Sequence, residues 1–445
     1  MFHKVLVANR GEIALRVIEA CRELSLESVA VFSEADAKMP YLGLASESCC
    51  IGPADSTKSY LNIPALISAA EVTGAEAVHP GYGFLAENPH FVEVCEEHEL
   101  VFIGPDRRAM DLVGNKLATR EAVASAGVPI LPGAAVPVDE GELYSVAEQI
   151  GYPLFVKAVF GGGGRGMRLV KSAQGLKEAV VAARTEAERA FGDPSLYLER
   201  AVDNPRHIEV QVLADHSGRM IHMGERECSI QRRYQKLIEE APAPHLDEPL
   251  RKGLHQTALA AAQALGYQNV GTVEFVLDSS GNFYFIEMNA RIQVEHPVSE
   301  VIAGVNLVKE QIRLAGGGAL ELSQETLNAR GHAIECRINA EDPTRGFLPS
   351  CGQIQVEELP TGNGIRLDTH LYNGMEVSPH YDSLLAKVIA WGRDREEART
   401  RMYTALERFR IGGVATTRSL MQEVISHPAF REERLGTNFL DELLG

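Results

Sequence analysis

Four segments in the middle of the sequence alternate polar and apolar residues, and this pattern constrains the fold more than any other feature. Period-two alternation is typical of β-strands that bury one face and turn the other toward polar surroundings. The last two segments flank Ser279–Asn282, whose composition is typical of a hairpin turn. We therefore expect long strands at His207–Ala214, Met220–Glu225, Thr272–Asp278 and Phe283–Asn289.

The predicted hairpin carries oxygen donors on one face. Glu287 and Asn289 are two residues apart, so both side chains leave the same side of the strand, and Glu274 lies on the partner strand among apolar residues. Unpaired carboxylates that face a core are costly unless they are paired or bound to a metal. Two carboxylates and an amide carbonyl are ligands that Mg²⁺ prefers, so the hairpin predicts a magnesium site. The alternative is that these glutamates face solvent.

The N-terminal part has a different pattern, in which short apolar runs alternate with helical periodicity. Strands alternating with helices predict a parallel sheet covered on both faces, with ligands bound at the carboxyl ends of the strands. Two loops at such ends, Asn9–Glu12 and His79–Gly83, are rich in polar residues and glycine. The predicted strands are Lys4–Ala8, Ser28–Phe32, Ala77–His79 and Val101–Ile103, and the predicted helices are Glu12–Leu26, Tyr60–Thr73 and Asn88–Glu97.

A glycine run, Gly161–Gly166, lies between strands predicted at Pro153–Ala158 and Met167–Lys171. It contains the GxGxxG pattern, but it does not lead from a strand into a helix, and no GK[ST] follows it, so dinucleotide and P-loop sites are excluded. Consecutive glycines between strands form a hairpin whose bare N–H groups can close over phosphates. Lys157, at the end of an apolar strand, favours such a lid over a flexible surface loop.

The segment Arg291–Glu295 alternates polar and apolar residues directly after the hairpin, which predicts three polar groups on one face. With Lys236, from the stretch Gln231–Lys236, these groups can enclose a small anion beside a base. A similar trio, His207, Glu209 and Gln211, is explained more simply as the polar face of a half-buried strand.

Composition narrows the class of protein. The formal net charge of -18 disfavours a nucleic-acid surface, although one MgATP needs only a small basic pocket. Six cations come from the proposed site segments: Arg226, Arg232, Arg233, Lys236, Arg291 and Arg337. No apolar run approaches the ~20 residues that span a bilayer, and the N-terminus lacks a secretory signal. The seven cysteines show no CxxC pair, which fits a reduced, cytoplasmic protein with no membrane partner.

Taken together, these motifs resemble one family, the biotin carboxylases of the ATP-grasp superfamily. The resemblance runs essentially from end to end. It rests on ANRGEIALR (Ala8–Arg16), SYLNIPALISAA (Ser59–Ala70), HPGYGFLAEN (His79–Asn88), GGGGRGMR (Gly161–Arg168), NPRHIEVQVLAD (Asn204–Asp215), EFVLDSSGNFYFIEMNARIQVEHPVSE (Glu274–Glu300) and RGHAIECRINAEDP (Arg330–Pro343).

The resemblance implies a three-lobed architecture of α/β and α+β type. Its parts would be an N-terminal parallel α/β domain (1–114), an ATP-grasp domain (115–325) with a mobile glycine-rich lid at about 131–201, and a mixed C-terminal domain (326–445). It also implies two sets of ligands. ATP would be held by Lys116, Lys157, Gly163, Gly164, Glu199, His207, Gln231 and Tyr234, and Mg²⁺ or Mn²⁺ by Glu274, Glu287 and Asn289.

The chemistry implied by the resemblance is carboxylation of biotin. Bicarbonate would bind Lys236, Arg291, Gln293, Val294 and Glu295, and Glu295 would be the base that removes its proton. The product, carboxyphosphate, would break down to CO₂ and phosphate beside the biotin ring. Phosphate would then take the ureido N–H proton, and Arg337 would stabilise the enolate charge. Tyr82 and Gly83 match positions next to biotin.

Several residues depart from the family pattern. Val159 and Phe160 replace a small residue and a glycine at the lid hinge, Tyr234 replaces a common histidine, and Arg200 replaces a lysine. Glu19 and Asn363 replace an arginine and an aromatic residue at the dimer interface of acetyl-CoA carboxylase relatives, whereas Glu23 and Arg366 remain. We still expect a homodimer.

The chain contains no Ala-Met-Lys-Met-type biotin attachment site, so we expect biotin to arrive on a separate carrier protein. Carboxyltransferase subunits would pass the carboxyl group on, most commonly to acetyl-CoA for fatty-acid biosynthesis, with pyruvate or another acyl-CoA left open. Two other functions are open: a different ATP-grasp ligase of nucleotide metabolism, and a non-catalytic relative that binds nucleotide. The HPGYGF loop and the Arg337 segment disfavour the first, and the full set of charged site residues disfavours the second.

Overall fold

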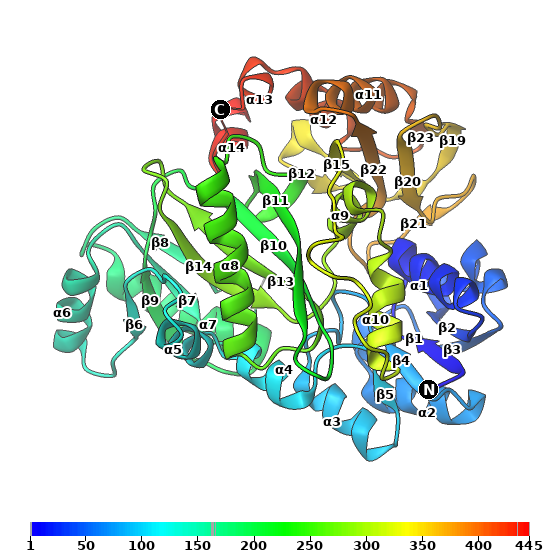
Figure 1. Ribbon diagram of the computed structural model, residues 1–445, viewed down its shortest axis with the longest axis horizontal. Helices are drawn as coiled ribbons and strands as arrows, with labels where there is room; N and C mark the ends of the chain where they lie inside the picture. The colour runs from blue at the N-terminus through cyan, green and yellow to red at the C-terminus, as the bar shows by residue number, and fades with distance from the viewer. Residues whose placement is uncertain (1, 162–163, 165, 434, 445) are drawn as a thin grey trace.

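The computed structural model describes residues 2–161, 164, 166–433 and 435–444. Its N-terminal lobe contains a five-stranded parallel sheet in the order β3-β2-β1-β4-β5, as the alternation of strands and helices predicts (Figure 1). The strands are β1 (Lys4–Val7), β2 (Glu27–Ser33), β3 (Glu47–Gly52), β4 (Ala77–His79) and β5 (Val101–Phe102). The α-helices are α1 (Gly11–Glu23), α2 (Ile63–Thr73), α3 (Pro89–Glu97) and α4 (Arg107–Gly114), and the short 3-10 helices are η1 (Glu34–Asp36), η2 (Pro40–Leu44) and η3 (Ser56–Lys58).

The strand order reverses between β1 and β4, so the loops that follow these strands lie side by side at the topological switch point. The Asn9 amide donates to the carbonyls of Pro80 and Tyr82, both at 2.7 Å, and this joins the two loops. Gly81 has φ +62°, and a Cβ there would lie 2.9 Å from Asn9 Nδ2, so the position requires glycine. The two polar loops found in the sequence therefore form one surface.

The long strands form an eight-stranded sheet in the order β14-β13-β10-β11-β12-β15-β22-β20, and every neighbouring pair is antiparallel. The β12–β15 pair joins the middle lobe to the C-terminal lobe, so one sheet runs through both. Its strands are β10 (Arg206–Ala214), β11 (Met220–Arg232), β12 (Gln235–Ala241), β13 (Asn269–Leu277), β14 (Phe283–Asn289), β15 (His332–Asn339), β20 (Ile365–Thr369) and β22 (Leu384–Gly392).

The two faces of this sheet differ as the period-two pattern predicts. In β10, Ile208 and Val210 are fully buried and belong to the same core as Leu254 and Ala258 of helix α8. Each such side chain contributes roughly 1.5–3 kcal/mol through burial. The opposite face carries the polar residues that the sequence predicts for a ligand site. The helices of this lobe are α5 (Lys116–Ser125), α8 (Glu248–Ala264), α9 (His296–Ala303) and α10 (Leu307–Ala315).

A separate four-stranded sheet, in the order β6-β9-β7-β8, forms the lid region on the left of Figure 1. β7 pairs antiparallel with β8, so the glycine run does connect two strands of a hairpin. Helices α6 and α7 share a small core of their own with the lid strands. The elements are β6 (Gly133–Ala135), α6 (Glu140–Ile150), β7 (Leu154–Ala158), β8 (Arg168–Val170), α7 (Leu176–Phe191) and β9 (Leu196–Arg200).

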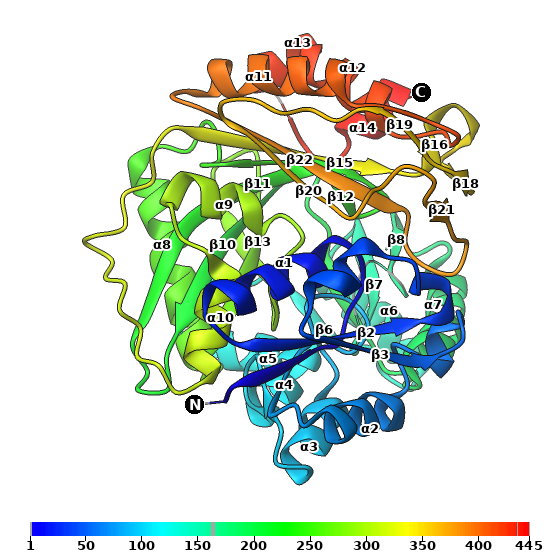
Figure 2. The same cartoon turned by 90° about the vertical axis from the view of Figure 1, so that its right-hand side faces the viewer.

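The rest of the C-terminal lobe consists of short strand pairs and helices, and its α-helices lie at the top in Figure 2. Among the described residues, no helix is both long enough and apolar enough to cross a membrane. The remaining elements are β16 (Glu341–Asp342), η4 (Pro343–Arg345), β17 (Leu348–Pro349), β18 (Gly352–Gln353), β19 (Gln355–Glu358), β21 (Glu376–Val377), α11 (Arg395–Arg408), β23 (Arg410–Gly412), α12 (Arg418–Ser426), α13 (Pro428–Arg431) and α14 (Phe439–Leu444).

Candidate active site

A cleft of about 1390 Å³ lies between the lobes, and residues from all of them line it. Gly163 lies outside the described residues. Every other residue to which the family resemblance assigns a role lines this one cleft: Tyr82, Gly83, Lys116, Lys157, Gly164, Glu199, His207, Gln231, Tyr234, Lys236, Glu274, Glu287, Asn289, Arg291, Gln293, Val294, Glu295 and Arg337.

The acidic hairpin lies as the sequence predicts. Glu274 on β13 is directly opposite Glu287 on β14, and the Asn289 amide donates to Glu274 Oε1 at 2.9 Å. His207 Nε2 lies 3.1 Å from Glu274 Oε2, and Lys116 Nζ lies 3.2 Å from Glu287 Oε2. Two carboxylates and one amide oxygen thus converge on one wall of the cleft, a donor set suited to a hard divalent cation.

Lys236 is the cationic centre of the cleft. Its ammonium lies 2.5 Å from Glu209, 2.8 Å from Glu274 and 2.7 Å from Glu295. Burial alone would lower the pKa of Lys236, but the three carboxylates outweigh it and raise that pKa well above its ordinary value. Lys236 is therefore a fixed positive charge, held where an anion that entered the cleft would meet it.

Glu295 is fully buried between two cations. Lys236 contacts one oxygen at 2.7 Å, and Arg337 Nη2 contacts the other at 2.9 Å. Burial would raise the pKa of Glu295, but Lys236, Arg337 and Arg226 together hold it well below its usual range. The carboxylate is thus ionised, and it becomes a stronger base when another anion shares its cations.

The segment from Arg291 to Glu295 does not continue the strand as its alternation suggests. β14 ends at Asn289, and the chain bends and turns into α9, whose N-cap is Glu295. The polar groups nevertheless face the cleft together: Arg291 donates to Asn289 Oδ1 at 3.2 Å and to Gln293 Oε1 at 3.0 Å. Arg291 also donates to Glu87 at 3.0 Å, a partner that sequence reasoning missed.

The lid side of the cleft holds a buried carboxylate between two cations. Glu199 on β9 accepts from Lys157 on β7 and from Arg120 on α5. Arg120 was not predicted as a site residue. Its side chain is 4% exposed, so losing Glu199 as a partner would leave a buried charge unpaired and cost free energy of folding. The odd placement of Lys157 in an apolar strand is thereby explained: it reaches Glu199 at the cleft wall.

The tip of the β11–β12 hairpin meets the lid. Tyr234 has φ +65° and is half exposed, and a Cβ on Gly164 would lie 3.0 Å from its ring. The Gln231 amide is already used, because it donates to the Cys228 carbonyl at 2.7 Å. Gly164 of the lid therefore packs directly on the tyrosine that departs from the family pattern.

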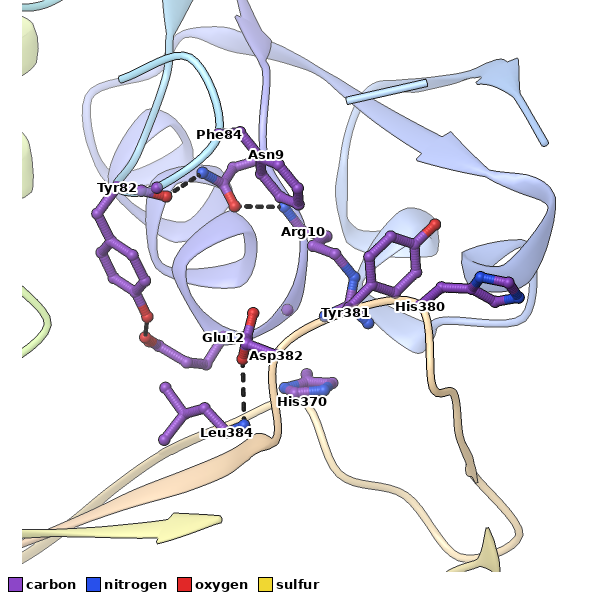
Figure 3. Close-up of a pocket in the computed structure, with 12 residues that line it drawn as sticks. Asn9, Arg10, Glu12, Tyr82, Phe84, His370, His380, Tyr381, Asp382 and Leu384 are labelled. Atoms are coloured by element: carbon purple, nitrogen blue, oxygen red, sulfur yellow. Dashed lines mark hydrogen bonds between the residues drawn. The ribbon is translucent and has the colours of Figure 1, made fainter. Parts of the chain in front are cut away.

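The N-terminal lobe closes the other end of the cleft. The Tyr82 hydroxyl donates to Glu12, as Figure 3 shows, and the Tyr82 carbonyl accepts from Asn9. A smaller cavity of about 260 Å³ continues behind Tyr82. Figure 3 shows His370 and Tyr381 of the C-terminal lobe across that cavity from Glu12.

Three of the six predicted cations do not line the cleft. Arg226 is fully buried behind it and donates to Glu209 and to Gln211. Arg232 instead packs over the Phe347 ring at 3.9 Å, and Arg233 occupies the turn of the hairpin. The expectation failed for Arg232 and Arg233 because charged residues at a hairpin tip point in several directions, and for Arg226 because its side chain is used inside the sheet. In addition to Lys236, Arg291 and Arg337, the lysines and arginines that line the cleft within the described part of the chain are Lys116, Lys157 and Arg200.

Comparisons with known proteins agree with this geometry. The sequence matches the family models "Biotin carboxylase, N-terminal domain" over residues 1–110, "Carbamoyl-phosphate synthase L chain, ATP binding domain" over 115–323 and "Biotin carboxylase C-terminal domain" over 335–442.

Full-length relatives show the same similarity. A biotin carboxylase of Pseudomonas aeruginosa is 50% identical over 100% of this chain and 99% of its own length. A pyruvate carboxylase subunit of Methanothermobacter thermautotrophicus is 50% identical over 99% of this chain and 90% of its own length. The biotin carboxylase domain dimer of Hydrogenobacter thermophilus 2-oxoglutarate carboxylase, solved with MgADP, ADP and bicarbonate, superposes with a TM-score of 0.96 at 47% identity, covering 99% of this chain and 98% of that one.

Proposed function

This chain belongs to the biotin carboxylase family and is an ATP-dependent ligase that carboxylates biotin, and we propose how the residues of its cleft divide that reaction. We assign three regions to it: 1–114, an ATP-grasp region 115–325 with its lid at about 131–201, and 326–445. The observation that carries the assignment of roles is Glu295, buried between Lys236 and Arg337 at the inner end of the cleft.

The nucleotide would lie between the lid and the acidic hairpin. Lys116, Lys157 and Glu199 lie on that side of the cleft, with His207, Gln231, Tyr234 and the lid glycines around them. Glu274, Glu287 and Asn289 would hold Mg²⁺ or Mn²⁺, which neutralises phosphate charge when bound. The fit of a divalent cation is supported by the register of the hairpin, which places the Glu274 and Glu287 carboxylates directly opposite each other. The Hydrogenobacter relative, solved with MgADP, has the same fold.

Bicarbonate would bind against Lys236, Arg291, Gln293 and the backbone at Val294. Because this anion draws on the cations that now hold Glu295, its arrival would raise the pKa of that carboxylate and make it a better base. Glu295 would then take the bicarbonate proton, and the oxygen would attack the γ-phosphate of ATP. ADP leaves, and the carboxyphosphate formed is confined by the lid, which keeps water away.

Carboxyphosphate would break down to CO₂ and phosphate next to biotin. Phosphate would accept the ureido N–H proton, and the nitrogen would then attack CO₂. Arg337 points its guanidinium at the same end of the cleft and would stabilise the negative charge that develops on the ureido oxygen. Tyr82 and Gly83 would flank the biotin ring.

We further propose the partners of the reaction. Biotin would be presented by a biotin carboxyl carrier protein, and carboxyltransferase subunits would use the product, with acetyl-CoA as the acceptor and fatty-acid synthesis as the pathway. Relatives named for pyruvate and 2-oxoglutarate carboxylation make those acceptors the alternatives. A homodimer is supported by the dimeric Hydrogenobacter domain. A cytoplasmic location is supported by seven cysteines that are all free thiols.

ATP cleavage by the purified chain tests the proposal. We expect cleavage with Mg²⁺ to depend on bicarbonate, to rise further with free biotin, and to yield labelled carboxybiotin. If the folded protein binds ATP but cleaves it at the same rate with and without bicarbonate, the assigned roles are contradicted.

A further inference from the structure

We propose that Lys387 is a positioning residue that ties the segment that binds bicarbonate to the tyrosine ring that flanks biotin. This inference rests on the proposed function, because those two elements receive their roles from it. Lys387 does not line the cleft and would not touch either substrate. It would act through Val294 on one side and through Glu12 and Tyr82 on the other.

Lys387 is a fully buried ammonium in the middle of an apolar strand. It lies on β22 between Ala386 and Val388, and its side chain is 0% exposed. It is the direct register partner of Arg337 on β15, so the two cations stand side by side on one face of the sheet. Burying a charge is expensive unless its partners compensate, so the contacts of Lys387 are tightly specified.

The first contact fixes the segment that would hold bicarbonate. The Lys387 ammonium donates to the Val294 carbonyl at 3.0 Å. Val294 lies in the turn between β14 and α9, which has no strand ladder to hold it. Its neighbours Gln293 and Glu295 carry the groups that face the anion. A hydrogen bond from a fixed cation therefore sets the height of this turn above the sheet.

The second contact fixes the ring that would flank biotin. The same ammonium lies 3.0 Å from Glu12 Oε1 in the first turn of α1, and 6.0 Å from the centre of the Tyr82 ring. Glu12 in turn accepts the hydroxyl hydrogen of Tyr82 (Figure 3). The Tyr82 backbone is held separately by Asn9, so Glu12 determines where the ring lies rather than where the loop runs.

These contacts join four positions that are far apart in the sequence, namely Glu12, Tyr82, Val294 and Lys387. Asp368, opposite Lys387 on β20, lies 3.8 Å from the ammonium and is itself held by Arg366 at 2.7 Å. Because the Lys387 ammonium contacts Val294 directly and Tyr82 through Glu12, three short polar contacts limit how far the two elements can move apart. That separation is the distance over which CO₂ must pass from the bicarbonate position to biotin, so Lys387 would maintain proximity without taking part in the chemistry.

Four proteins test the proposal: the parent, Glu12→Gln, Lys387→Met and the double variant, which removes both buried charges at once. The KM for ATP, bicarbonate and free biotin and the kcat would be measured in the cleavage and carboxybiotin assays. For Lys387→Met we expect the KM of bicarbonate and of biotin to rise at least about tenfold, as loss of a charge-assisted hydrogen bond predicts, with the KM of ATP within twofold. For Glu12→Gln only the KM of biotin should rise, because the bond to Val294 remains.

Arg395→Met is the matched control. It removes the cation of another buried pair, with Glu240, whose arginine side chain is 12% exposed and lies outside the cleft. It should lower stability without changing any KM. A uniform rise of all three KM values in Lys387→Met, or a fall in kcat alone, would show a general packing role and overturn the proposal. If Lys387→Met does not fold, the double variant and Glu12→Gln decide the same question.

Failure of the proposed function would look different. A parent protein that cleaves ATP without regard to bicarbonate would remove the premise, whereas an active parent whose variants show no selective change in KM would refute the positioning role alone.

Discussion

Replacing Arg337 by alanine separates the two halves of the reaction. Arg337 contacts Glu295 through Nη2 at 2.9 Å and Glu239 through Nε at 2.6 Å. Its removal takes away the cation assigned to the ureido oxygen but leaves Lys236 on Glu295 at 2.7 Å. Proton removal from bicarbonate should therefore survive, and the carboxylation of biotin should not.

The size of the effect follows from the stabilisation that Arg337 would give to the negative charge on the ureido oxygen. Removing one preorganised donor from a developing oxyanion costs about 10²–10³ in kcat, or about 3–4 kcal/mol. We expect carboxybiotin formation to fall by that factor and bicarbonate-dependent ATP cleavage to fall less than about tenfold. The variant should fold, because burial raises the pKa of Glu239 to about 7 even in the presence of Arg337. Once the arginine is lost, Glu239 can take up a proton instead of remaining charged.

The assay counts phosphate and labelled carboxybiotin in the same reaction. Arg395→Ala is the control, because that arginine is 12% exposed against 14% for Arg337 and pairs with a buried glutamate away from the cleft. An equal loss of both products in Arg337→Ala would show that the arginine acts before carboxyphosphate forms. Parental rates for both products would refute its role altogether.

Three further predictions concern pH, stability and metal. Burial raises the pKa of Glu239 from an ordinary 4.5 to about 7, so the folded state holds an extra proton between these pH values and the unfolding free energy should fall by roughly 3 kcal/mol as pH rises through this window. Urea midpoints of the parent and of Glu239→Gln would show the difference, and identical pH slopes would contradict it. Arg226→Met should cost about 3–5 kcal/mol because it leaves the buried Glu209 short of a partner, and Glu209→Gln in addition should recover part of that loss in thermal denaturation. Glu287→Gln should raise the Mg²⁺ concentration needed for half-maximal ATP cleavage, and an unchanged Mg²⁺ dependence would remove Glu287 from the metal site.

The parts of the fold that the sequence predicts well are those with local periodicity. The alternation of β10 and β13 identified strands whose apolar face packs on α8, and the hairpin of Glu274, Glu287 and Asn289 has the predicted partners. The loops after β1 and β4 were marked by their polar and glycine content, and their contact follows from the strand order. Local chemistry sufficed in these cases because the partners lie close in sequence or in a regular ladder.

The residues that sequence reasoning missed are charged groups whose partners are distant. Glu12 and Lys387 are 3.0 Å apart in space but lie in different lobes, and nothing in a single sequence pairs them. One signal was available: a lysine within the apolar strand Leu384–Gly392 is as unusual as Lys157 in its own strand. The bend after Asn289 was also missed, because alternation persists there even though no strand partner exists.

The pairing of β12 with β15 has a consequence for anyone who divides this chain. Excising the C-terminal part would strip a neighbour from β12 and leave an open row of unpaired N–H and C=O groups, which is a template for aggregation. Among the described residues the β6-β9-β7-β8 sheet forms no ladder with its surroundings, so we expect the segment that carries it to tolerate exchange between relatives if Arg120, the partner of Glu199, is kept. Chimaeras should therefore be joined at the lid, because a boundary between the middle and C-terminal parts would cut through one continuous sheet.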